Sequence, residues 1–185
     1  MAFNVAEFRA NMIGDGARPN LFQVTLTFPT FAQNGSAAGA KTTFMAKAAQ
    51  LPGSTIGTVS MNYFGREVKF AGNRSFQQWS LTIINDEDFS VRNAFERWMS
   101  GLNAHVHNLR LPSLMSSADY QQEAFITQYG KSGDVLKVYK MVGCFPTDLS
   151  AIDVDWGADN IEDFTVTFAY QWWESVFPIP TTDFV

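Results

Sequence analysis

Residues 71–88 read AGNRSFQQWSLTIINDED, a stretch that joins an alternating pattern to three consecutive carboxylates. Trp79, Leu81 and Ile83 alternate with polar residues, which predicts a strand with one face on a core and the other in solvent. A shift of one residue would move this apolar set into water, so the pattern also predicts the register of the strand. Residues 72–74, Gly-Asn-Arg, are interpreted as the turn before it.

The acidic triplet at residues 86–88 is interpreted as the start of a helix rather than as a metal site. Asn85 would cap this helix, and negative side chains in a first turn favour the helix dipole by about 0.3–1 kcal/mol each. Successive helical residues point about 100° apart, so three in a row do not converge on one ion. Apolar residues then recur at helical spacing, which predicts a helix over residues 86–100 that is closed by Gly101.

Further strands are expected in six places where residues alternate or where apolar runs lie between turn signals: residues 21–28, 42–51, 123–129, 135–145, 152–156 and 164–172. The last two are interpreted as a terminal β-hairpin with an aromatic face. Residues 54–70 contain short strand pieces broken by Gly57 and Gly65. The side chains assigned to the core are Trp79, Leu81, Ile83, Phe95, Trp98, Val166 and Phe168.

Three segments of the single predicted domain, residues 1–185, are expected to lie outside the folded body: residues 1–16, residues 29–41 and residues 175–185. In the first, Asn4 would cap a short helix, with Phe3 and Phe8 packed across its start. The second is rich in Gly and Ala and carries no charge before Lys41, which predicts a projecting loop.

The composition favours one domain with a substantial core. The chain has 185 residues, of which 46% are hydrophobic and 17% are charged. Its net charge of -5 argues against a surface that grips nucleic acid, because phosphate neutralisation needs clustered cations. The single cysteine, Cys144, cannot form an internal disulfide. No signal-peptide pattern and no apolar run of membrane-spanning length occurs, so a cytoplasmically made protein is expected.

No motif indicates catalysis. His105 and His107 form a weak metal signal, since no cysteine or fixed carboxylate completes a ligand set. With two histidines in the chain, no nucleophile–base arrangement can be built, so no catalytic residue, metal or cofactor is expected. Four aromatic residues could stack on sugar rings or bases, but their spacing favours a core face: Phe95, Trp98, Trp172 and Trp173. Of the functions considered, the residues alone are most compatible with assembly of copies through open strand edges.

Four blocks of sequence carry a resemblance to a known family: ARPNLFQV at 17–24, FAGNRSFQQWSLTIINDED at 70–88, CFPTDLSAIDVDW at 144–156 and FTVTFAYQWWE at 164–174. In order and spacing they resemble the tail tube proteins of contractile-tailed (myovirus) bacteriophages. The resemblance implies a mainly β, antiparallel sandwich or barrel-like fold with a flanking helix. It also implies hexameric rings that stack into a hollow tube, through which viral DNA passes without specific binding.

The implied partners are other copies of the chain, the tail sheath, and baseplate and terminator proteins at the tube ends. The implied location is the virion, after assembly in the host cytoplasm. Polar strand faces are the candidates for the lumen: Gln78, Ser80, Thr82, Thr165 and Thr167. Contacts between rings are expected at Arg18, Phe31, Asn34, Gly35 and Ser36. Two alternatives remain: a tube subunit of a secretion or injection system, and a carbohydrate-binding β-sandwich.

Overall fold

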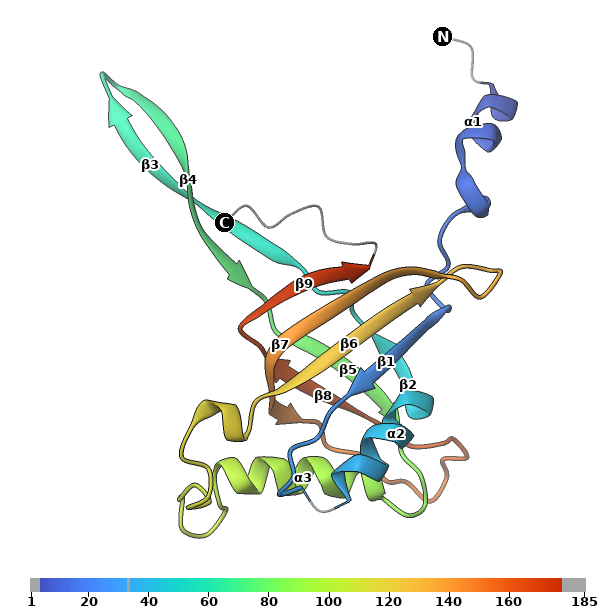
Figure 1. Ribbon diagram of the computed structural model, residues 1–185, viewed down its shortest axis with the longest axis vertical. Coiled ribbons are helices and arrows are strands. Elements are labelled where there is room, and N and C mark those ends of the chain that lie inside the picture. The colour runs from blue at the N-terminus through green and yellow to red at the C-terminus, as the bar shows by residue number, and fades with distance from the viewer. Residues whose placement is uncertain (1–3, 33, 178–185) are drawn as a thin grey trace.

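The protein is built around a seven-stranded antiparallel β-sheet that folds over at its longest strand (Figure 1). The computed structural model describes residues 4–32 and 34–177. Along the sheet the strands follow the order β1 (Phe22–Leu26), β6 (Gln122–Tyr129), β7 (Val135–Leu149), β8 (Asp163–Ala169), β5 (Trp79–Ile84) and β2 (Ala46–Ala49), and β9 (Trp172–Phe177) also pairs with β7. The mainly β, antiparallel architecture expected from the sequence is confirmed.

Strand β7 belongs to both halves of the folded sheet. Residues 138–142 pair with β9, whereas residues 145–149 pair with β8. Gly143 lies between these stretches with a φ of 72°, a left-handed conformation that side chains with a Cβ rarely adopt. A Cβ there would also lie 2.8 Å from Cγ of Gln171. The glycine therefore permits the bend that brings the two halves around one core.

Strand β5 forms in the predicted register. Trp79, Leu81 and Ile83 are each no more than 1% exposed, and the residues between them are half-buried. Across the antiparallel ladder, Leu81 pairs with Val166 and Trp79 with Phe168, so both strands bury the same kind of face. Burial of one such aliphatic side chain is worth about 1.5–3 kcal/mol. All seven side chains assigned to the core are buried.

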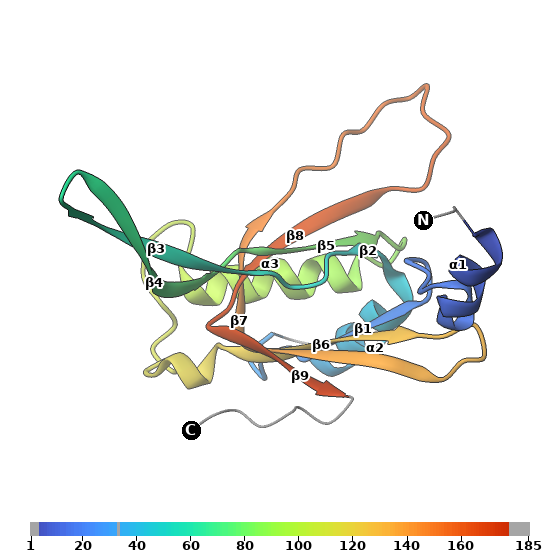
Figure 2. The ribbon, with the colours of Figure 1, turned by 90° about the horizontal axis from the view of Figure 1, so that it is seen from above.

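Helix α3 (Ser90–Leu102) closes one end of the folded sheet (Figures 1 and 2). Phe95 and Trp98 face inward and are fully buried, as their helical spacing predicted. The Trp98 indole N–H donates to the backbone oxygen of Tyr120 at 3.1 Å, and the rings of Phe28 and Phe95 lie 4.8 Å apart. The helix thereby extends the aromatic core begun by β5 and β8.

The start of α3 was predicted four residues too early. The side chain of Asn85 donates to Glu162 instead of capping a helix, and Phe89 has a left-handed φ of 51°. The helix begins after that residue, at Ser90, whose backbone N–H donates to Asp88 Oδ1 at 3.0 Å. Gly101 does not close the helix, since it lies within it and is buried. The acidic triplet therefore belongs to a turn before the helix.

The expected projecting loop at residues 29–41 is wrong over its second half, because residues 35–41 belong to helix α2 (Gly35–Met45). The small residues allow this helix to lie close against β1. A Cβ on Gly39 would lie 2.8 Å from the backbone oxygen of Leu26, and one on Gly35 would lie 2.8 Å from Cβ of Phe28. The Gly and Ala content that suggested a loop is instead a requirement of close packing. The helix also shortens the expected strand at residues 42–51 to β2.

Residues 54–76 form one long hairpin, not short strands after which a turn follows at 72–74. Strands β3 (Ser54–Tyr63) and β4 (Arg66–Phe76) pair along their length, and the turn is at Phe64 and Gly65. Both turn residues have positive φ, 45° and 77°, as two-residue hairpin turns favour. A register irregularity between Ile56 and Thr58 accommodates the glycine-containing segment within the ladder.

The expected terminal hairpin of residues 152–156 with 164–172 does not form. Residues 150–162 make a long connection without strands, while β8 pairs with β5 and with the end of β7. Val154 and Trp156 are fully exposed or nearly so, because no partner strand covers them. Trp172, the last residue of the predicted strand, instead begins β9, a separate element.

The N-terminal helix α1 (Val5–Asn11) confirms part of its prediction. The Asn4 side chain accepts from the backbone N–H of Ala6 at 3.1 Å and caps the helix. Phe3, the proposed partner of Phe8, lies outside the described residues, as do residues 178–185 of the C-terminal extension. Two short 3₁₀ helices complete the described elements, Ile13–Asp15 and Ser117–Asp119.

Candidate assembly surfaces

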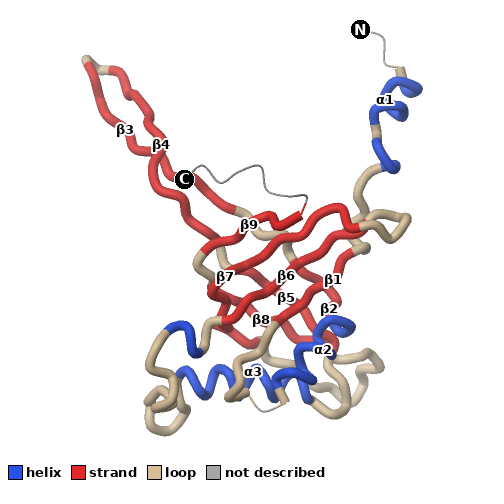
Figure 3. Tube along the Cα trace, in the orientation of Figure 1, coloured by secondary structure: helices blue, strands red, loops and turns tan. Residues whose placement is uncertain are grey.

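The β3–β4 hairpin projects from the body as a separate two-stranded sheet, here called the arm (Figures 1 and 3). Directly paired residues share a face of such a ribbon. Val59 pairs with Phe70, Met61 with Val68 and Tyr63 with Arg66, so one face is apolar almost to the tip. The residues between them form a polar face: Ser60, Asn62, Glu67 and Lys69.

The apolar face of the arm is open to solvent. Its five apolar side chains have exposed fractions between 39% and 68%: Val59, Met61, Tyr63, Val68 and Phe70. An isolated two-stranded hairpin is at best marginally stable in water, and a contiguous exposed apolar surface marks an interaction site. The arm was not predicted from the sequence, because its glycines were interpreted as breaks between short strands. The alternation of Val59, Met61 and Tyr63 before the Phe-Gly turn would have identified it.

The predicted lumen residues lie on the outward face of β5 and β8. Thr82 pairs with Thr165 and Ser80 with Thr167, and the two threonine hydroxyls of the first pair lie 3.1 Å apart. These four side chains are half-buried, and Gln78 is exposed one residue before β5. The structure therefore brings four of the five predicted residues together on one polar surface, opposite the buried face of the same strands.

Charges around this polar surface are mostly negative. Asp148 pairs with Thr167 in the ladder between β7 and β8, and Asp163 pairs with Ile84 at the end of β5. The nearby Lys47 of β2 forms an ion pair with Asp163 and is thereby compensated. Small hydroxyl groups with compensated or negative charges offer little attraction for a polyanion.

The residues predicted to contact other rings fall in two classes. Phe31 and Gly35 contribute to internal packing: Phe31 packs against Gly101 of α3, where an added Cβ would lie 2.4 Å from its ring, and Gly35 is buried. Arg18, Asn34 and Ser36 are exposed. Asn34 and Ser36 lie at the start of α2, which is on another side of the body from the arm (Figure 1).

Helix α1 is a second projecting segment, and none of its residues is buried. Val5 is 69% exposed and Phe8 is 63% exposed, while Ile13 in the following 3₁₀ helix is 95% exposed. Helix α1 and the arm extend from the same end of the body, on opposite sides of it (Figure 1). The apolar side chains of α1 add to the surface that the folded body leaves open.

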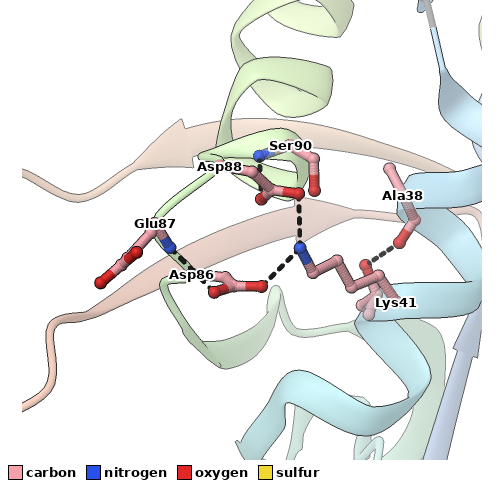
Figure 4. Close-up of polar contacts among 7 residues, drawn as sticks. Ala38, Lys41, Asp86, Glu87, Asp88 and Ser90 are labelled. Atoms are coloured by element: carbon pink, nitrogen blue, oxygen red, sulfur yellow. Dashed lines mark hydrogen bonds and ion pairs between the residues drawn. The ribbon is translucent and has the colours of Figure 1, made fainter.

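The acidic triplet forms an ion-pair clasp between α2 and the turn before α3 (Figure 4). Lys41 Nζ lies 2.5 Å from Asp86 Oδ2 and 2.6 Å from Asp88 Oδ2. Asp86 Oδ1 also accepts from the backbone N–H of Glu87 at 2.9 Å. Two of the three carboxylates therefore have a structural partner that lies 45 or more residues away, which the sequence did not reveal.

Hydrogen bonding in the clasp shifts the titration of its members. Chiefly the hydrogen bond from Lys41, and then the bond from the Ser90 backbone, lowers the pKa of Asp88 to about 2. The bond from Lys41, followed by that from the Glu87 backbone, lowers the pKa of Asp86. The same bonds to Asp86 and Asp88 raise the pKa of Lys41. The clasp is fully charged over the neutral range.

Groups considered for chemistry do not converge in the described part of the chain. Within residues 4–32 and 34–177, no cluster of three or more His, Cys, Asp or Glu side chains is arranged to hold a metal ion. Burial raises the pKa of the Cys144 thiol to about 12, which keeps it protonated. Phe95 and Trp98 are inaccessible to a sugar ring because they are fully buried. None of the described helices combines the length and apolarity needed to cross a membrane.

The amino-acid sequence is similar to a known family and to several of its members. A family model described as phage tail tube protein matches residues 17–176. The chain is 32% identical over 168 residues to the tail tube protein gp19 of Enterobacteria phage T4, which covers 90% of this chain and 96% of that protein. A tail tube protein of Serratia phage KSP90 is 25% identical over 169 residues, with 90% and 93% covered.

Solved structures share the fold at low sequence identity. The tube terminating cap of the anti-feeding prophage has a TM-score of 0.61 at 17% identity and covers 86% of this chain and 90% of that chain. The sheath–tube complex of the extracellular contractile injection system PVC has a TM-score of 0.58 at 11% identity, with 94% and 98% covered. Both likenesses concern the fold.

Proposed function

The chain belongs to the phage tail tube protein family, and from that premise we propose that it is the repeating subunit of the hollow inner tube of a contractile phage tail. Hexameric rings form first and then stack. The role is structural rather than catalytic, and the assembled tube is the conduit through which viral DNA leaves the virion. Assembly takes place in the host cytoplasm.

The observation that carries this proposal is the arm. The body of the subunit buries its own core, yet the arm holds an apolar face in water with side chains 39–68% exposed. Covering such a face with a neighbouring copy removes apolar area from water, which is the dominant favourable term in association. A subunit with this feature is suited to an assembly and poorly suited to remain alone.

Negative-stain microscopy and light scattering of the pure protein test the proposal. Hollow rings or tubes are the expected particles, and a homogeneous monomer at all concentrations would contradict it. Met61→Ser with Phe70→Ser interrupts the apolar face of the arm without touching the buried core, so this variant is expected to stay monomeric. The matched control is Asn62→Ala, which alters the polar face of the same hairpin and is expected to assemble.

The polar surface of β5 and β8 is assigned to the lumen. It is formed by the hydroxyl groups of Ser80, Thr82, Thr165 and Thr167. The nearby cation Lys47 is paired with Asp163, so this surface offers little attraction for phosphate. Thr82→Lys with Thr165→Lys would place ammonium groups on that surface. Tubes of this variant are expected to bind DNA with strong salt dependence, whereas wild-type tubes are not. Equal DNA binding by both would remove the assignment.

Partners at the outside and ends of the tube follow from the same role. Structures of similar fold come from a sheath–tube complex, a sheath/tube terminator and a baseplate. By analogy, a sheath protein surrounds this tube, and terminator and baseplate proteins occupy its ends. Isolation of the parent particle, followed by mass spectrometry of its components, tests each partner separately.

A tube subunit of a contractile injection system is the second candidate, because chains from such systems share the fold over 94% of this chain. The parent particle distinguishes the two. A DNA-filled head attached to the tail supports the phage reading, whereas a headless particle with a terminating cap supports the injection system. Both readings use the same subunit surfaces.

A further inference from the structure

Another exposed apolar segment lies far from the arm, in the loop that joins β7 to β8. This segment, residues 150–162, is here called the acidic loop. Val154 is 83% exposed, Trp156 is 107% exposed and Ile161 is 75% exposed. Connections of this length without secondary structure are uncommon in compact domains and are usually functional. The exposed apolar side chains of the acidic loop therefore mark it as another interaction site, like the arm.

We infer that the arm of one copy docks onto the acidic loop of the next copy, head to tail. The inference rests on the proposed function and specifies which two surfaces of the subunit meet. It identifies the occupant of each exposed apolar surface as a second copy of this chain. The observations that carry it are the exposed apolar side chains of both segments, their opposite charges and their separation in the fold.

The two segments carry opposite charges. The arm contains three cations, Arg66, Lys69 and Arg74, and one carboxylate, Glu67. The acidic loop contains four carboxylates and no Lys or Arg: Asp153, Asp155, Asp159 and Glu162. Opposite charges around apolar contacts orient an interface and suppress wrong pairings. The complementarity therefore favours contact between arm and acidic loop over contact between two arms.

The other apolar segment at the α3 end of the molecule lacks this complementarity. Residues 103–118 expose Val106 and Met115, at 84% and 91%, but their charged side chain is the cation Arg110 and they contain no carboxylate. An arm with an excess of cations would find no opposite charge there. The acidic loop is thus the better receptor of the two.

A hollow beside the acidic loop offers room for a side chain of the arm. Its volume is about 310 Å³, and its lining includes three carboxylates, Asp153, Glu162 and Asp163. Of these, Glu162 accepts from the side chain of Asn85 and Asp163 pairs with a lysine, which leaves Asp153 as the carboxylate best placed to meet an incoming cation. Arg66, next to the arm's turn, is the cation that reaches furthest from the body.

The arm and the acidic loop cannot meet within one subunit. In Figure 1 the arm extends from one end of the body while the acidic loop lies at the other end, beside α3, and in Figure 2 they extend in different directions. A contact between them therefore joins different copies and leaves a free arm and a free loop at the two ends. Such a heterologous contact repeats until it closes or continues as a helix.

Charge reversal tests the inference with two variants. In each of them the arm and the acidic loop carry charges of the same sign, so copies of one variant are expected to repel each other at this contact. Variant one, Arg66→Glu with Lys69→Glu, gives an acidic arm and keeps the acidic loop. Variant two, Asp153→Lys with Asp159→Lys, gives a basic loop and keeps the basic arm. Each alone is expected to lose tube formation. An equal mixture is expected to restore it, because each reversed surface then meets an opposite charge on the other variant.

All outcomes are informative. Tube formation by either variant alone, or failure of the mixture to restore tubes, overturns the inference while wild-type tubes keep the proposed function. A wild-type protein that never assembles overturns both. All four substituted residues are exposed, so circular dichroism and the unfolding midpoint are expected to match the wild type and to exclude misfolding.

Cross-linking adds a direct readout. The double variant Asn62→Cys with Asn160→Cys places one thiol on the arm and one on the acidic loop without changing the charge of either segment, and the native Cys144 is buried and held protonated. A short bismaleimide joins two thiols, so assembled protein is expected to yield a ladder of dimers, trimers and larger species on denaturing gels. Either single variant can yield dimers at most. A ladder no longer than a dimer in the double variant overturns the head-to-tail contact.

Discussion

The arm and the β5–β8 pair are both antiparallel ribbons with one apolar face, and they differ in what covers that face. In the β5–β8 pair the apolar side chains are at most 1% exposed, because α3 and the other half of the folded sheet pack on them. In the arm the equivalent side chains are 39–68% exposed. Alternation therefore specifies the two faces of a ribbon, whereas the rest of the chain or another copy supplies the cover.

The largest expected effect is at the centre of the covered ribbon. Phe168→Ala removes a ring that contacts Trp79 at 5.1 Å and Phe95 at 5.8 Å between centroids. The variant is expected to lose about 3–5 kcal/mol of unfolding free energy, since a cavity replaces a fully buried aromatic side chain. Urea unfolding measures this. The matched variant in the arm, Phe70→Ala, is expected to unfold like the wild type, and an equal loss there would show that the arm is covered by its own subunit.

A smaller effect is expected where α3 meets the chain before α2. Gly101→Ala places a Cβ 2.4 Å from the ring of Phe31, so that ring must move. The expected cost is about 1–3 kcal/mol, typical of overpacking, measured by thermal or urea unfolding. The control is Gly53→Ala, because a Cβ on Gly53 meets nothing within 4 Å. Unchanged stability in the Gly101 variant would show that this contact is loose.

The ion-pair clasp between Lys41 and the two carboxylates is expected to make the stability of the body depend on pH. Because the pKa of Asp88 is lowered to about 2 from an ordinary value near 3.8, its contribution to stability is present above pH 3.8 and is lost as pH falls toward 2. The pKa of Lys41 is raised, so its contribution is present below its ordinary value of 10.5 and is lost as pH rises past its folded value.

Lys41→Met tests this linkage. Its unfolding free energy is expected to differ from the wild type across the neutral range, and the difference should shrink at both pH extremes. Lys69→Met is the control in the arm, where the nearest carboxylate oxygen lies 4.0 Å away, and should show no such profile. A difference that does not depend on pH would mean that packing of the lysine stem, rather than its charge, stabilises the junction.

The smallest effect on the isolated subunit is expected from the arm itself. Val59→Ser with Val68→Ser removes apolar area from a face that is already in water, so the unfolding free energy is expected to change by no more than about 0.5 kcal/mol. Assembly is expected to fail in the same variant, as followed by light scattering. A large loss of monomer stability would mean that the arm packs on its own body in solution.

The sequence predicted the elements whose pattern is local and regular. Strand β5 and the inward face of α3 follow from periods of two and 3.6 residues, and the side chains that these periods assigned to the core are buried. The polar surface of Thr82 and Thr165 follows from the same alternation. The family resemblance, carried by motifs spread over most of the chain, indicated the tube function.

Predictions failed where local composition has two interpretations. Glycines suggested a projecting loop over residues 29–41 and breaks in the arm, yet Gly39 is small so that a helix can approach β1, and Gly72 lies within a strand. Residues 152–156 alternate like a strand but have no partner, because β8 already pairs with β5 and β7. Whether a segment is a loop, a helix or a strand there depends on distant neighbours.

The alternating faces, the aromatic core and the family of this protein could be predicted from residue order and spacing, on which they depend. Only the folded structure establishes the remaining features. It determined that Lys41 meets Asp86 and Asp88, that the arm stands apart from the body, and that the arm and the acidic loop point away from each other. Those relations join residues far apart in the chain, and folding alone brings them together or separates them.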